Sequence, residues 1–139
     1  MPHSSPTIAH PRSIPVHFAP LPRPTAPQPR QGLCVRFYSN IHLGTGLNVA
    51  IHVPSLAAEL QVQGWVQACR QRGRNRFTIL IQFPDPLQAQ RIRMLEQVCH
   101  ILAYQQQCQR RGLRLSTEQA AQEWIHQHAA QFPGVELDC

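Results

Sequence analysis

The sequence predicts a mainly β protein with α-helical additions, in which a small antiparallel β-barrel or tightly curled sheet precedes a long helix and a second helix. Apolar and polar residues alternate in four segments of the central part, which is typical of half-buried strands. Turns that contain glycine separate these segments at short spacing. After the last segment, apolar residues recur at every third or fourth position, as on one face of a helix.

Residues 1–30 hold more than half of the chain's 13 prolines. Proline removes amide donors and holds the chain extended, so we expect a flexible basic arm here. Ile14, Val16 and Phe18 could add one short edge strand. No acidic residue occurs before Glu59, which leaves this arm purely cationic.

Four strands are expected in the part of the chain that follows. They lie at residues 33–39, 47–53, 59–71 and 76–83. In the last of them Phe77, Ile79, Ile81 and Phe83 should point inward. Gly73 and Asn75 provide turn chemistry between the last two strands, so the run "CRQRGRNRF" is expected to form an exposed hairpin tip.

Two helices are expected after the strands. Pro86 suits a first helical turn, and the apolar stripe from Leu87 continues to about Arg111. Gly112 ends this helix. Ser116 is the expected N-cap of the next one, with Gln119 completing a capping box. We therefore divide the chain into the arm at 1–30, a barrel with the start of the long helix at 31–104, and a helical extension at 105–139.

The second predicted helix, which follows Ser116, is expected to have an apolar side. The residues on this side are Ala121, Trp124, Ile125, His128 and Phe132. This side would pack on the chain's own domain or in a partner groove.

Composition narrows the class of partner. The 139 residues have a formal net charge of +6, and every basic residue is arginine. This balance favours anionic partners, and an arginine can bind a phosphate with two hydrogen bonds. A genome rich in GC base pairs would also favour arginine over lysine.

Compartment and membrane signals point to a cytoplasmic protein. The five cysteines are an odd number without a CxxC pair, which suits a reducing compartment. We see no secretory signal and no apolar stretch of about 18 residues.

The sequence favours neither a metal site nor an enzyme. Cys99 and Cys108 are nine residues apart on one predicted helix and should face opposite sides, and His126 and His128 are also misaligned. Carboxylates are scattered, and no nucleophile has a clear partner. We therefore expect no metal, no cofactor and no catalysis.

Several segments together resemble a PilZ domain. They are "GLCVRF", "LGTGLNVAIHVP", "VQGWVQACR" and "FTILIQF", followed by a tail, "RMLEQVCHILAYQ" and "GLRLSTEQAAQEWIHQHAAQFP", that is similar to the helical extension of some PilZ proteins. The resemblance covers about residues 31–133. It implies a six-stranded split β-barrel with packed helices, and a bacterial receptor or adaptor in cyclic di-GMP signalling.

In that family an RxxxR motif and a D/NxSxxG motif bind the dinucleotide. Here no RxxxR occurs, and "PQPRQG" keeps only Gly32 of the second motif. The resemblance thus leaves Arg12, Arg23, Arg30 and Gly32 as candidate ligand residues. It implies either weak binding of cyclic di-GMP or a non-binding adaptor that acts through protein contacts or self-association of its C-terminal helices.

A nucleic-acid-binding β-barrel is the alternative function. The hairpin would then bind phosphates through Arg70, Arg72, Arg74 and Arg76. The predicted strands lack the exposed aromatic residues that commonly stack on bases, which weighs against this alternative.

Overall fold

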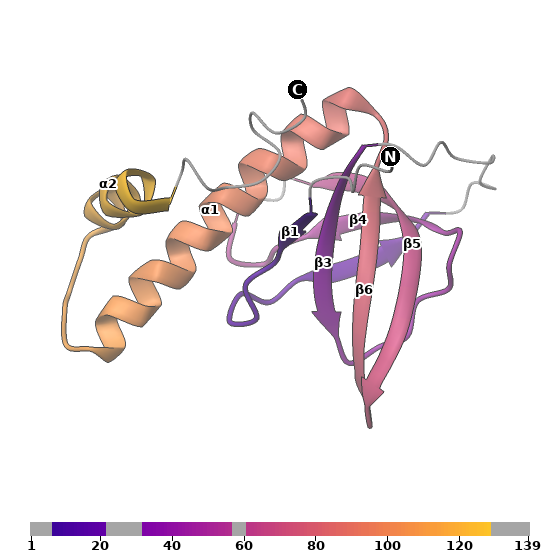
Figure 1. Cartoon of the computed structure of the whole chain (residues 1–139), viewed down its shortest axis with the longest axis horizontal. Helices are drawn as coiled ribbons and strands as arrows, with labels where there is room; N and C mark the ends of the chain where they lie inside the picture. The colour runs from indigo at the N-terminus through magenta and orange to yellow at the C-terminus, as the bar shows by residue number, and fades with distance from the viewer. Residues whose placement is uncertain (1–6, 22–31, 57–60, 129–139) are drawn as a thin grey trace, which may run out of the picture.

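The computed structural model describes residues 7–21, 32–56 and 61–128, which form one six-stranded sheet and two helices (Figure 1). The strands are β1 (Thr7–Ala9), β2 (His17–Pro20), β3 (Leu33–Ser39), β4 (Asn48–His52), β5 (Val62–Gly73) and β6 (Arg76–Phe83). The helices are α1 (Pro86–Arg110) and α2 (Thr117–His128). A mainly β protein with two helices after the strands is thereby confirmed.

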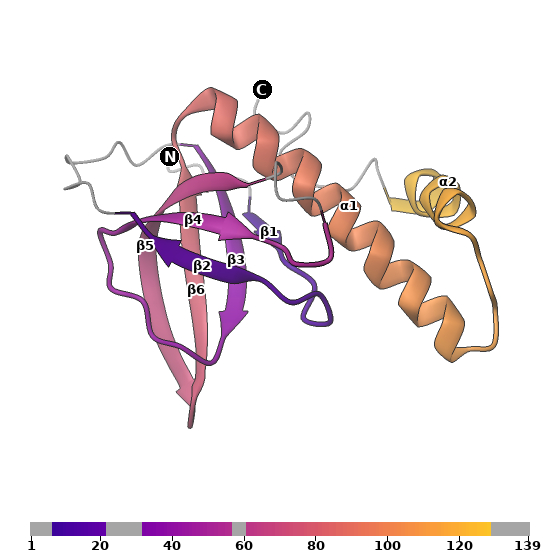
Figure 2. The same ribbon diagram turned by 180° about the vertical axis from the view of Figure 1, so that it is seen from behind.

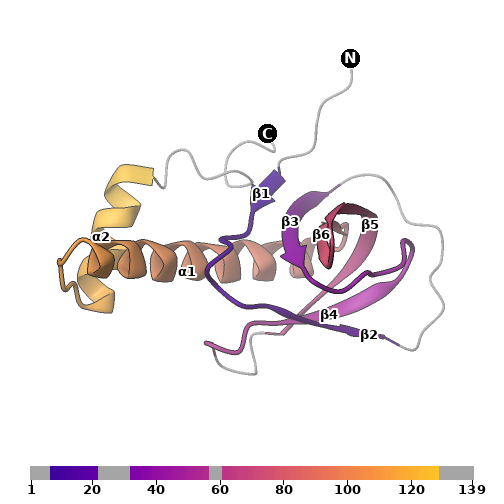
Figure 3. The same ribbon diagram turned by 90° about the horizontal axis from the view of Figure 1, so that it is seen from below.

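The sheet has the order β1-β3-β6-β5-β4-β2. Only β1 and β3 pair in parallel, and the other neighbours are antiparallel. The sheet curls on itself, as the view from below shows (Figure 3), and its inner face forms one apolar core. The strand order starts at β1 and ends at β2, so the sheet described here is curled but not closed into a barrel.

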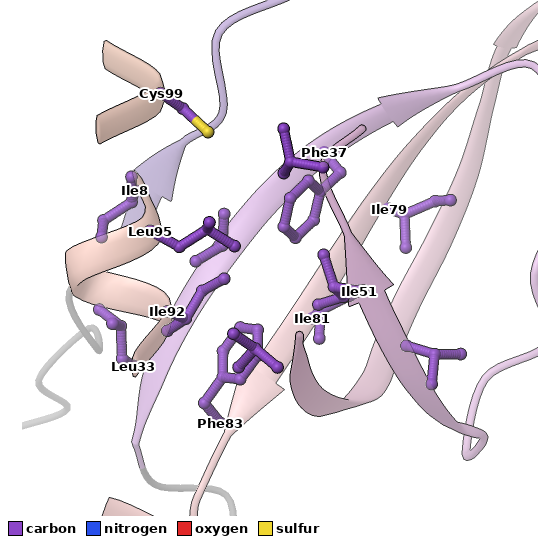
Figure 4. Close-up of a cluster of buried hydrophobic side chains, with 14 of the residues drawn as sticks. Ile8, Leu33, Phe37, Ile51, Ile79, Ile81, Phe83, Ile92, Leu95 and Cys99 are labelled. Atoms are coloured by element: carbon purple, nitrogen blue, oxygen red, sulfur yellow. The ribbon is translucent and has the colours of Figure 1, made fainter. Parts of the chain in front are cut away.

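The four strands expected from alternation are confirmed, two of them with the predicted ends. Their inward positions form the core: Val35, Phe37, Val49, Ile51, Val62, Val66, Ile79, Ile81 and Phe83 are all at most 1% exposed. Several of these side chains meet Ile92 and Leu95 of α1 in Figure 4. Of the residues expected to point inward from β6, Phe77 is only half-buried.

Residues 7–21 are not a flexible arm, contrary to our expectation for residues 1–30. They form β1 and β2, one at each end of the strand order. Ile8 and Ile14 are buried in the core, at 0% and 2% exposure. Burial of Ile8 in β1 and of Ile14 in the β1–β2 connection outweighs the conformational bias of the prolines. Of the expected edge strand, Phe18 lies in β2, whereas Ile14 and Val16 precede it.

The long helix α1 is capped at its N-terminus by Asp85, whose side chain accepts a hydrogen bond from the Gln88 amide at 3.2 Å. Its first half covers one opening of the curled sheet, and its second half extends away from the sheet (Figures 1 and 2). Ile92, Leu95 and Cys99 are its buried members of the core.

The second helix packs on the distal part of α1 (Figure 2). The Ser116 and Gln119 capping box is confirmed: the Gln119 amide donates to Ser116 Oγ at 3.1 Å, and the Ser116 amide donates to Gln119 Oε1 at 3.0 Å. Ala120 and Trp124 are its buried residues. Ile125 was expected on this side but is 52% exposed, and Phe132 lies outside the described residues.

Among the described residues, no helix combines the length and the apolar character needed to cross a membrane.

Candidate functional site

An arginine-rich groove of about 620 Å³ lies at the end of the sheet that carries the β5–β6 hairpin. Its lining residues are Arg12, Arg36, Tyr38, Ser39, Asn40, Arg72, Asn75, Arg76, Phe77 and Thr78. We call this hollow the arginine groove. It combines the β1–β2 connection, the end of β3 and the hairpin, which are far apart in the sequence.

Strand alternation explains why polar side chains gather here. In β3, Val35 and Phe37 are fully buried, so Arg36 and Tyr38 point to the outer face of the sheet. Thr78 pairs with Tyr38 in the neighbouring strand and therefore points the same way. The inner face builds the core while the outer face builds the groove.

The hairpin adds Arg72 and Arg76, and a local irregularity of the strand pairing positions Arg72. The register between β5 and β6 shifts between Gln71 and Gly73, which leaves Arg72 as the extra residue of a β-bulge. Arg72 Nε donates a hydrogen bond to Thr78 Oγ1 at 3.1 Å. Asn75 has a φ of 55° in the two-residue turn, and Gly73 pairs with Arg76 across it. The expected hairpin is confirmed, with Arg72 held against the outer face of β6.

Arg12 covers the groove from the β1–β2 connection. Its guanidinium carbon lies 4.2 Å from the centroid of the Tyr38 ring, a distance typical of a cation–π contact. This contact places the guanidinium of an N-terminal residue beside the arginines of β3 and the hairpin.

The groove is strongly electropositive. None of its ten lining residues, all in the described part of the chain, carries a carboxylate, and four are arginines. Burial raises the pKa of Tyr38, but hydrogen bonds and positive charge from Arg12 and Arg36 outweigh burial and lower that pKa below its usual value. The shift reflects a site that stabilises negative charge.

The structure regroups the residues that sequence reasoning selected. Arg12, Arg72 and Arg76 belonged to two different hypotheses, yet they line one groove. Arg70 and Arg74 are exposed on the hairpin and do not line it. Arg23 and Arg30 lie outside the described residues.

Gly32 lies away from the arginine groove, at the opposite end of β3. Its φ is 114°, and a Cβ atom there would lie 2.6 Å from the carbonyl oxygen of Phe83. Only glycine accommodates both constraints, so the described contacts give Gly32 a structural role at the junction of β3 and the end of β6.

Sequence reasoning missed Arg36 and Tyr38 as site residues. The alternation of "LCVRFYS" already places both on the outer face, and this was the available signal. Their meeting with Arg12 depends on the parallel pairing of β1 with β3, which no local pattern indicates.

No protein-family model, curated protein or solved structure matches this chain. The evidence for the candidate site is therefore its geometry and charge.

Proposed function

We propose that this protein is a noncatalytic binding protein whose arginine groove takes a compact phosphodiester anion, with cyclic di-GMP as the first candidate. The observation that carries the proposal is the convergence of Arg12, Arg36, Arg72 and Arg76 on a groove without a carboxylate. Guanidinium groups donate pairs of hydrogen bonds to phosphate oxygens. A volume of about 620 Å³ is within the range of small-molecule sites, which favours a compact ligand.

The PilZ resemblance supplies the rest of the proposal: a split-barrel domain in cyclic di-GMP signalling in the bacterial cytoplasm. The curled six-stranded sheet followed by a helix supports this assignment at the level of architecture. In our proposal the groove arginines bind the ligand, a role that the motif ending at Gly32, incomplete here, has in the family. A chain that binds no dinucleotide would instead act as an adaptor, through protein contacts or self-association of its C-terminal helices.

Isothermal titration calorimetry of the full chain with cyclic di-GMP tests the receptor form of the proposal. We expect saturable binding, weakened about tenfold or more by Arg12→Ala or Arg72→Ala, since a hydrogen bond to a charged group contributes about 1.5–3 kcal/mol. Arg74→Ala is the matched control, because Arg74 lies on the same hairpin outside the groove. Absence of heat at high micromolar ligand would exclude the receptor form and leave the adaptor form.

Nucleic-acid binding is the second candidate, and the exposed Arg70 and Arg74 favour it because they extend the positive surface beyond the groove. A single-stranded oligonucleotide would then bind with an affinity that falls steeply with salt. Filter binding distinguishes the candidates: the double variant Arg72→Ala and Arg74→Ala should lose oligonucleotide binding. An unchanged affinity would exclude this function.

A further inference from the structure

A second polar cluster is buried between the end of β1 and the face of α1. It consists of His10, Glu96 and Cys99, which are 3%, 0% and 0% exposed. His10 Nδ1, a carboxylate oxygen of Glu96 and Cys99 Sγ all lie within 4.8 Å of one another. Cys99 points from α1 toward the β1 segment in Figure 4. We call these three residues the His-Glu-Cys cluster.

The helix presents two of the three donors on one face, because Glu96 and Cys99 are three residues apart. The third donor comes from a residue 86 positions earlier than Glu96. The backbone amide of His10 donates to the Arg36 carbonyl at 2.9 Å and so extends the pairing of β1 with β3. Sheet pairing therefore brings His10 against the helix.

The orientation of the His10 ring is fixed by its second nitrogen. Nε2 lies 2.8 Å from the carbonyl oxygen of Ile14, and a carbonyl can only accept, so Nε2 carries the hydrogen. Nδ1 then faces Glu96 Oε2 at 2.6 Å, and one proton is shared between these two atoms. A histidine that binds a metal through one nitrogen commonly donates the other N–H to a carbonyl in this way.

The second oxygen of Glu96 is an independent indication of a ligand. Oε1 is buried and accepts no hydrogen bond from the described residues. His100 Nε2 is 3.8 Å away and instead donates to the Ala9 carbonyl at 3.0 Å. A buried acceptor without a partner is unfavourable, and a cation in the cluster would satisfy it.

We propose that the His-Glu-Cys cluster binds one divalent cation of the zinc type, through His10 Nδ1, the Glu96 carboxylate and Cys99 Sγ. The nitrogen, oxygen and sulfur donors are those that zinc takes in proteins, at bond lengths of about 2.0–2.3 Å. Tetrahedral bonds of that length set donor atoms about 3.3–3.6 Å apart. The donor atoms of the cluster lie within 4.8 Å of one another, so rotations of the three side chains would bring them to this spacing. Both oxygens of Glu96 together would provide a fourth donor.

The exchange of protons for the metal ion in the cluster leaves its net charge unchanged. Without metal the cluster holds a neutral Cys99 thiol and one proton shared by His10 and Glu96. A divalent cation replaces those two protons and leaves a thiolate, a carboxylate and a neutral imidazole around two positive charges. The net charge of this buried site is therefore zero in both states, so binding buries no uncompensated charge.

The bound ion would join the connection after β1 to α1. That connection carries Arg12, two residues beyond His10, so the same ion would hold one wall of the arginine groove. The metal site does not depend on the proposed function, because its evidence lies in the core. Loss of anion binding and loss of metal binding are measured separately.

Cobalt titration of the untagged full chain, first treated with a chelator, tests the proposal. Co²⁺ replaces zinc in such sites, and a thiolate ligand produces a sulfur-to-cobalt charge-transfer band in the near ultraviolet. We expect that band to saturate at one equivalent and to disappear when Zn²⁺ is added. Zn²⁺ should also raise the midpoint of thermal unfolding.

Three variants make the test specific. Cys99→Ser should abolish the charge-transfer band and the thermal shift, whereas Cys34→Ser, another buried free cysteine, should keep both. His52→Ala is the control for a second pair of histidines, because the rings of His52 and His17 lie 6.4 Å apart on the β2–β4 edge of the sheet. This variant should change neither signal. The proposal is overturned if no band forms with the folded wild-type chain, or if Cys99→Ser retains the band.

Discussion

Tyr38 shows how a single side chain reports the charge of its surroundings. Two arginines hold its pKa below the ordinary value of about 10, against the effect of burial. Deprotonation would place a negative charge inside the groove that we propose for an anion. If the groove binds an anion as proposed, that binding should therefore weaken at alkaline pH.

The affinity of the groove for cyclic di-GMP should fall as the pH rises through the lowered pKa of Tyr38, because the phenolate repels the phosphates. The stability of the free protein should change in the opposite sense. Because the pKa of Tyr38 is lower in the folded state than in the unfolded state, the free energy of unfolding should increase as the pH rises through the folded-state pKa. Calorimetry between pH 7 and pH 10 measures the first effect. Tyr38→Phe should remove the alkaline loss, and a loss of equal size in that variant would contradict this explanation.

Gly32 and Gly46 allow backbone strain to be separated from steric overlap. Both have positive φ, at 114° and 87°, but only Gly32 has a carbonyl oxygen 2.6 Å from the position of a Cβ atom. We expect Gly46→Ala to lower the free energy of unfolding by about 1–2 kcal/mol, the cost of a left-handed non-glycine residue. Gly32→Ala should cost more, since the backbone must also move.

Urea denaturation of the two glycine variants checks this order. Equal losses would mean that the end of β6 adjusts freely around residue 32.

The short helix α2 is held by a capping box at its N-terminus and by packing on α1. Its capping box satisfies two backbone donors, and Ala120 and Trp124 bury one side on α1. The Tyr104 hydroxyl of α1 donates to the Glu123 carboxylate at 2.8 Å. This bond, together with desolvation and the neighbouring Cys108, raises the pKa of Tyr104 to about 12. The contacts between the helices thus combine apolar and polar groups.

Ser116→Ala should destabilise α2 by about 1 kcal/mol, the usual cost of losing an N-cap side chain. The effect should be largest in amide hydrogen exchange of residues 117–128, with little change in the sheet. Thr117→Ala is the control, because Thr117 is exposed. Equal protection in the two variants would mean that packing on α1 alone holds the helix.

The molecule as a whole depends on its N-terminal segment. Residues 7–21 supply both outer strands of the sheet and two core isoleucines. His10 also joins them to α1 through Glu96. A segment with the composition of a linker is therefore an integral part of the domain.

Ile8→Ala should lower the free energy of unfolding by about 2–5 kcal/mol, as for other fully buried large-to-small changes. Ile41→Ala, at a position that is 65% exposed, should change it by no more than about 0.5 kcal/mol. Chemical denaturation followed by circular dichroism compares them. Similar losses in the two variants would mean that β1 is not part of the cooperative unit.

The sequence by itself determined the elements whose patterns are local: β3, β6, the hairpin turn at Asn75, and the capping box of α2. In these segments side-chain alternation, turn chemistry and capping all act within a few residues. Only the tertiary structure decided what β1 and β2 do, which arginines share a groove, and that His10 meets Glu96 and Cys99. Those outcomes depend on contacts between residues far apart in the sequence, such as His10 and Glu96, which are 86 positions apart. Burial of Ile8 and Ile14 in the core overrode the proline-rich local signal.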